Sequence, residues 1–250
     1  MAILTQFIFR LSFGMALGMA LTNPRQVTSG YYRNHLYVLL GLNVLATMVA
    51  FSNRDQFVLA PPLLAAVLSY VGAVAWLYEK PRAGIVLLAL VSAVSLWGAW
   101  AGTTWPAGAN LGTSLLIGLD PLTSGLVLGI TMAAMFLGHW YLNTPTMVIA
   151  PLLRLVVLMG LAVILRGAIE AVVVTDYWRA AGLTTEQLIF LSLRWLSGIF
   201  GMLGLTIMAY KTLQIPNTQA ATGILYVGVI ASFLGELTAL LLSVQSAGVV

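Results

Sequence analysis

The chain has 250 residues, of which 60% are hydrophobic and only 7% are charged. Roughly a quarter of the residues in a soluble domain carry charge, so this composition excludes a soluble globular protein. The chain contains no cysteine, which excludes disulfides, thiolate metal sites and cysteine nucleophiles. Its formal net charge of +4 comes from basic residues scattered along the chain, so no nucleic-acid partner is predicted.

About 20 apolar residues are needed to cross the hydrocarbon core of a bilayer as a helix. The sequence contains eight such stretches, at residues 3–22, 35–52, 57–78, 84–102, 122–142, 146–173, 187–210 and 219–244. Residues typical of turns, such as Asn and Pro, separate most of them. The sequence therefore predicts an all-α fold, a polytopic transmembrane bundle of about eight helices that forms a single integral membrane domain over residues 1–250.

Lysine and arginine in the loops predict the orientation of the bundle, because these residues gather on the cytoplasmic side. The loops after the first, third, fifth and seventh stretches contain five of them, and the loops on the other side contain two. The five are Arg25, Arg33, Lys80, Arg82 and Lys211, and the two are Arg54 and Arg179. We therefore expect both termini on the outer side of the membrane.

The longest connection, residues 103–120, is expected outside the membrane. Its glycines and the apolar run Leu115-Leu116-Ile117 predict an interfacial strap or a short re-entrant segment. Asp120 is therefore assigned to a loop.

Glycines are spaced for close helix packing. Gly14 and Gly18 are one helical turn apart, and Gly198, Gly201 and Gly204 share one helix face. A comparison of residues 1–125 with 126–250 shows only loose echoes at two turns that contain proline, so no internal repeat is predicted.

Ionisable side chains inside a bilayer cost about 3 kcal/mol or more each, so each one calls for a partner or a purpose. Five of them are predicted at a similar depth in the outer half of the membrane: Arg10, Arg166, Glu170, Arg194 and Glu236. Arg166 and Glu170 are one helical turn apart and are predicted to pair within a helix. Arg194 and Glu236 would then pair between helices.

Three arginines and two glutamates leave this cluster with a net charge of +1, which an anionic group could neutralise. We therefore interpret it as a polar pocket near the outer face for a quinone headgroup, a carboxylate or a lipid phosphate, since arginine binds such groups through its planar fork. The alternative is a structural ion network that fixes how the helices pack.

A second set of polar side chains is predicted near the inner face: His35, His139 and Arg154. Two histidines on different helices are the minimum for a b-type haem. Neither is deeply embedded, so the sequence favours interfacial hydrogen bonding over ligation of a haem by His35 and His139. No motif for a metal site, a hydrolase or a nucleotide-binding loop is present, so we assign no catalytic residue.

The last stretch reads Leu225-Tyr-Val-Gly-Val-Ile-Ala-Ser-Phe-Leu-Gly-Glu236-Leu. Because of this stretch, the eight helices and the two termini outside, the chain resembles the NrfD/DmsC-type membrane subunits. These subunits are the quinol-interacting anchors of bacterial respiratory oxidoreductases. The resemblance covers topology along the chain and sequence around Gly235-Glu236, and no quinone-site motif matches in the first helices. It implies a multi-pass protein of a bacterial inner membrane, a quinol site near Glu236 and the outer arginines, and metal centres in partner subunits.

We therefore expect an integral membrane subunit of a respiratory or other electron-transfer or energy-converting complex, in contact with quinone or lipid through the Arg/Glu cluster. Its expected partners are the lipid bilayer and other membrane or redox subunits. Short loops and missing catalytic motifs favour a non-catalytic subunit over an independent enzyme. The alternatives are a small-solute transporter or channel, in which the same charges would line a path, and a membrane scaffold or assembly subunit.

Overall fold

The computed structural model describes residues 3–52, 56–105, 108, 110–144, 146–180 and 184–245. Side chains at positions 56–58, 174–180 and 244–245 are outside this description. Of the residues used for the orientation, Arg54 and the side chain of Arg179 therefore lie outside the described part. The structure is 88% helical, and its described residues form no strand.

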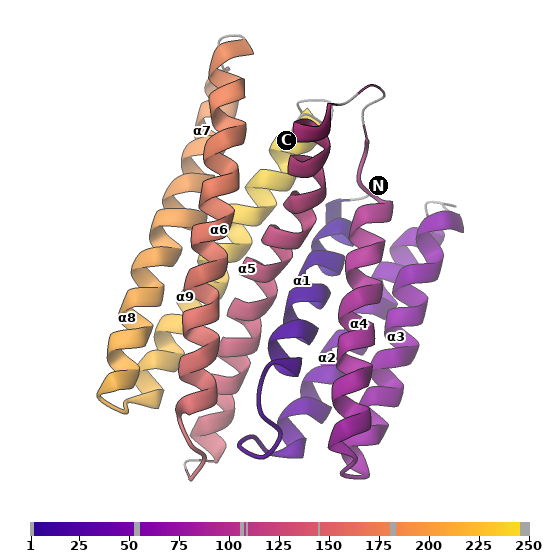
Figure 1. Cartoon of the computed structure of the whole chain (residues 1–250), viewed down its shortest axis with the longest axis vertical. Coiled ribbons are helices and arrows are strands. Elements are labelled where there is room, and N and C mark those ends of the chain that lie inside the picture. The colour runs from indigo at the N-terminus through magenta and orange to yellow at the C-terminus, as the bar shows by residue number, and fades with distance from the viewer. Residues whose placement is uncertain are drawn as a thin grey trace.

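The helices in chain order are α1 (Ile3–Ala20), α2 (Ser29–Ser52), α3 (Gln56–Leu77), α4 (Pro81–Ala101), α5 (Leu111–Asn143), α6 (Ala150–Ala180), α7 (Thr185–Leu193), the π-helix η1 (Arg194–Gly201), α8 (Met202–Gln214) and α9 (Thr218–Gln245). α7, η1 and α8 are continuous and form one span. Within the described residues, eight helices are long and apolar enough to cross a membrane. The predicted all-α, multi-pass bundle is confirmed, and its even number of spans puts both chain ends at one end of the bundle (Figure 1).

The eight spans form two halves, α1–α4 and α5–α9, which lie side by side in Figure 1. In the first half, contacts run from α1 to α2, to α3, to α4 and back to α1. In the second half they run in the same order, from α5 to α6, to α8, to α9 and back to α5. Both halves therefore have the same cyclic order of neighbouring spans.

Glycines bring the backbones of α1 and α5 together where the two halves meet. A Cβ atom on Gly14 would lie 1.8 Å from the carbonyl oxygen of Gly125, and one on Gly129 would lie 2.0 Å from the amide nitrogen of Met15. Gly198 of η1 and Gly235 of α9 make a second close crossing, where a Cβ on Gly235 would lie 2.4 Å from the Cα of Gly198. The predicted close packing is confirmed at Gly14 and Gly198, whereas a Cβ on Gly204 would meet no atom within 4 Å.

α5 begins eleven residues before the stretch predicted at 122–142, so the expected strap at 115–117 was wrong. The side chain of Asn110 caps the helix by accepting a hydrogen bond of 2.8 Å from the amide of Thr113. The helix then continues through Pro121, although a proline has no backbone N–H to donate within the helix. Asp120 is consequently a helical residue and enters the bundle.

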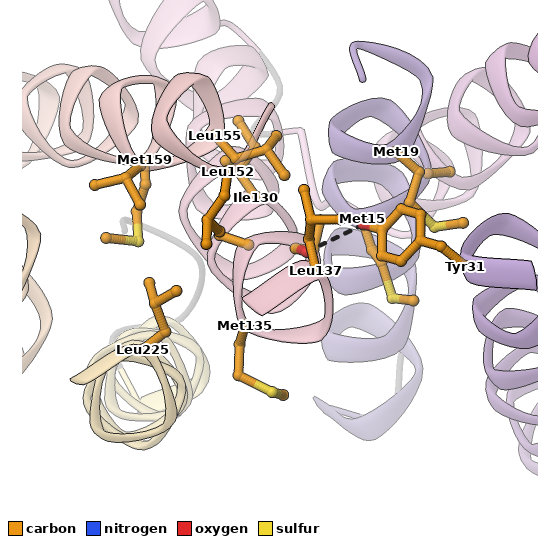
Figure 2. Close-up of a cluster of buried hydrophobic side chains, with 14 of the residues drawn as sticks. Met15, Met19, Tyr31, Ile130, Met135, Leu137, Leu152, Leu155, Met159 and Leu225 are labelled. Atoms are coloured by element: carbon orange, nitrogen blue, oxygen red, sulfur yellow. Dashed lines mark hydrogen bonds between the residues drawn. The ribbon is translucent and has the colours of Figure 1, made fainter. Parts of the chain in front are cut away.

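The described core is apolar towards the end of the bundle opposite the termini. Its labelled members in Figure 2 are Met15, Met19, Tyr31, Ile130, Met135, Leu137, Leu152, Leu155, Met159 and Leu225, all of them buried. They come from α1, α2, α5, α6 and α9, so this apolar layer spans both halves.

Candidate functional site

Six buried or half-buried charged side chains form one connected network in the bundle. Its members come from five helical segments: Arg10 of α1, Asp120 of α5, Arg166 and Glu170 of α6, Arg194 of η1 and Glu236 of α9. All five residues expected from the sequence are therefore brought together, and Asp120 joins them. We call these six residues the ionic network.

Arg166 is the centre of the ionic network. Its Nε and Nη2 atoms donate to the two carboxylate oxygens of Glu236, at 3.0 and 2.9 Å. Its Nη1 atom contacts Asp120 Oδ1 at 2.7 Å and the hydroxyl of Thr123 at 3.2 Å. Nη2 also lies 3.0 Å from Glu170 Oε1, which confirms the predicted pair within the helix. A guanidinium fork suits this arrangement because its donors lie in one plane.

Glu170 connects Arg166 to the π-helix. Its Oε1 atom accepts from both Arg166 and Arg194. The predicted pair of Arg194 with Glu236 was therefore wrong, since Glu236 is held by Arg166 instead. Arg194 is the first residue of η1, and the wider turn of a π-helix changes which side chains face the bundle. Helical spacing in the sequence does not reveal such a change of register.

Asp120 links the network to the first half of the molecule. Its Oδ2 atom lies 2.7 Å from Arg10 Nη2, and its Oδ1 atom lies 2.7 Å from Arg166 Nη1. The ionic network therefore bridges α1 in one half and α5, α6, η1 and α9 in the other.

Asp120 also changes the charge of the cluster. Three arginines now face three carboxylates, so the network is balanced when all six groups are ionised. The expected excess of +1 was wrong, because Asp120 was assigned to a loop. A balanced network does not need an anion, and it favours a neutral polar ligand over a carboxylate or phosphate.

Three buried polar atoms in and beside the network have no hydrogen-bond partner among the described residues: Arg10 Nε, Ser124 Oγ and Glu170 Oε2. An unpartnered buried polar group costs about 1–3 kcal/mol, so such a group calls for an explanation. The set consists of a donor, a hydroxyl and a carboxylate acceptor. Each of these atoms could hydrogen-bond to a group of the complementary kind.

Sequence reasoning missed Asp120 and Thr123. The Asp120-Pro121 pair is typical of a turn, so the span was predicted to begin after it, which is too late along the chain. The charge excess was itself a signal, because a buried cluster with one uncompensated cation calls for a third carboxylate at the same depth.

The residues predicted near the inner face, His35, His139 and Arg154, make their contacts with other residues and not with one another. His35 is buried, its Nδ1 lies 2.6 Å from the carbonyl oxygen of Tyr31, and its ring centroid lies 4.3 Å from that of Phe136. His139 is exposed and its Nδ1 lies 3.1 Å from the hydroxyl oxygen of Tyr226, while Arg154 is exposed on α6. The two imidazoles therefore make their contacts with different helices.

Within the described residues, no group of three or more His, Asp or Glu side chains could hold a metal ion. Comparison of the chain with protein-family models, with curated proteins and with solved structures finds no match in any of the three. The resemblance to NrfD/DmsC-type subunits therefore rests on topology and on Gly235-Glu236 alone.

Proposed function

We propose that this chain is an integral membrane subunit of an electron-transfer or energy-converting complex, and that the ionic network contacts a quinone headgroup. The observation that supports this proposal is the buried, charge-balanced network, in which Arg10 Nε and Glu170 Oε2 have no hydrogen-bond partner. Six charged groups near lipid are expensive to retain, which favours a role beyond packing.

The chemistry of a quinone matches the unpartnered atoms better than that of a phosphate. A quinone is neutral, so it leaves the charge balance of the network intact. The hydroxyl of the reduced form can donate to Glu170 Oε2, and the carbonyl of the oxidised form can accept from Arg10 Nε–H. A lipid phosphate would instead add a negative charge to a balanced site.

Partner subunits are proposed on a separate ground. A subunit that only exchanges electrons through quinone needs redox centres elsewhere, because the described side chains offer no metal-ligand cluster and the chain has no cysteine. The resemblance to quinol-interacting anchors supports the same proposal, including a bacterial inner membrane location.

Gentle purification from native membranes, followed by mass spectrometry and an absorption spectrum, tests this function. Co-purifying redox subunits and bound quinone are the expected result. A single colourless chain that binds a soluble solute would contradict the proposal.

Transport of a small solute remains the second candidate because of one specific observation. The third span of each half carries an unusual feature: α3 contains Pro61 and Pro62, and the seventh span contains the π-helix η1. Hydrophobic segments that contain helix-breaking features in corresponding positions of two halves are typical of transporters. Solute flux into vesicles that contain only this chain would favour this candidate over the electron-transfer subunit.

A further inference from the structure

Asp120 lies where the ionic network approaches the membrane surface. Its side chain is 25% exposed, whereas the other five members are at most 6% exposed. Residues 110–120 are exposed or half-buried, and α5 becomes mostly buried from Pro121 onwards. The network is therefore closed to the surroundings except beside Asp120.

The position of Asp120 along α5 places it near one end of the membrane span. Asp120 lies 23 residues before Asn143, the last residue of α5. At about 1.5 Å per residue this is roughly 35 Å, which exceeds the hydrocarbon thickness of about 30 Å. Asp120 thus reaches the interfacial layer at the end of the bundle that carries both termini.

Ser124 continues this polar face into the bundle. It lies one helical turn from Asp120, on the same face of α5, and it is fully buried with an unpartnered hydroxyl. Thr123 beside it is also fully buried and accepts a hydrogen bond from Arg166. The Ser124 hydroxyl has no accessible surface in this conformation, so water reaches it only when neighbouring side chains move.

The polar face ends one to two turns further along α5. Thr131 is fully buried, but its hydroxyl donates to the carbonyl of Val127 within the same helix. The apolar layer of Figure 2 follows, with Ile130 of α5, Met15 of α1 and Met159 of α6. These side chains separate the ionic network from the opposite end of the bundle.

We propose that water enters the ionic network from the end of the bundle that carries both termini, past Asp120, and reaches Ser124 but not Thr131. The network is a water-accessible site that opens to one side and is closed by the apolar layer on the other. This inference does not depend on the identity of the ligand or on electron transfer.

Single cysteines test this route directly, because the chain has no cysteine of its own. Ser124→Cys changes one atom at the predicted end of the route, and Thr131→Cys is the matched control, seven residues further along the same helix and equally buried. Leu119→Cys, at an exposed position beside Asp120, is the positive control. A small cationic thiosulfonate that does not cross membranes is added to either side of oriented vesicles.

Ser124→Cys is expected to react from the side of the termini and not from the other, while Thr131→Cys stays unreactive from both. Asp120→Asn in the same background should slow the cationic reagent more than a neutral one. The proposal is overturned if Ser124→Cys behaves like Thr131→Cys, if it reacts from the opposite side, or if only a lipid-soluble maleimide modifies it. If Ser124→Cys does not fold, Thr123→Cys gives the same readout at the neighbouring buried hydroxyl.

Discussion

Arg166 is the residue on which the ionic network depends. Its guanidinium contacts three carboxylates from three helices, and it is almost completely buried. Removal of one partner from a buried ionic group leaves the others uncompensated, which costs far more than the pair itself contributes.

Arg166→Gln should therefore lower the free energy of unfolding by about 3–5 kcal/mol. The reason is that Asp120, Glu170 and Glu236 would face one another without their shared cation. Arg154→Gln is the matched control on the same helix, and its exposed position predicts a change within about 0.5 kcal/mol. Thermal unfolding in detergent measures both, and equal stability of the two variants would refute the central role of Arg166.

Single residues also show what the sequence could and could not predict about the site. The Arg166 and Glu170 pair follows from spacing within one helix, and it was predicted. The partners of Arg194 and Arg10 depend on helix packing and on the register of η1, which local spacing does not encode. Asp120 was missed because a proline follows it, although the helix continues through that proline.

At the scale of elements, two glycine crossings position the helices that carry the charges. Gly14 meets Gly125 and Gly129 between α1 and α5, next to Arg10 and Asp120. Gly198 meets Gly235 between η1 and α9, next to Arg194 and Glu236. Close backbone approach at these points brings long side chains from different helices within reach of one another.

Gly129→Ala should destabilise the bundle by about 1–3 kcal/mol, since the added methyl would overlap the backbone of α1. Gly41→Ala is the control, because a Cβ there would meet no atom within 4 Å. Unfolding by sodium dodecyl sulfate in mixed micelles compares the two variants. A neutral Gly129→Ala would show that the α1 and α5 backbones are not in contact.

The π-helix η1 makes a distinct prediction about chain length. A π-helix holds extra residues relative to an α-helix, so deletion of the exposed Leu196 should leave the flanking helices nearly in register. Deletion of the exposed Ile207 in α8 should instead rotate the preceding residues by about 100° and take Arg194 away from Glu170. Accumulation and thermal stability of the two deletion variants distinguish them. Equal damage by both deletions would contradict the assignment of the π-helix.

At the scale of the whole molecule, the sequence predicted the class of fold but not the division of its spans into two halves. Runs of apolar residues define eight spans almost without regard to context, which explains that success. The order of packing depends on contacts between spans far apart in the sequence, which apolar runs do not encode. The segments at 11–21 and 122–132, where α1 and α5 cross, share Gly-x-x-x-Gly.

The two halves also clarify the location of the site. Five of the six charges belong to the second half, and Arg10 crosses to them from the first. The ionic network thus joins the halves at one end of the bundle, while the apolar layer joins them towards the other (Figure 2). A ligand at the network would contact both halves.

The most direct measurement of the central claim, that the ionic network binds quinone, is the amount of quinone retained per chain by mass spectrometry after release from native membranes. Glu170→Gln is the informative variant, because its remaining oxygen can still accept from Arg166 and Arg194 while its amide replaces the unpartnered Oε2. We predict that wild type and Arg154→Gln retain quinone, and that Glu170→Gln retains about tenfold less per folded chain, since a hydrogen bond to a charged group contributes about 1.5–3 kcal/mol. Equal retention in all three proteins, or no quinone in wild type, would contradict the claim and leave the network with a structural role.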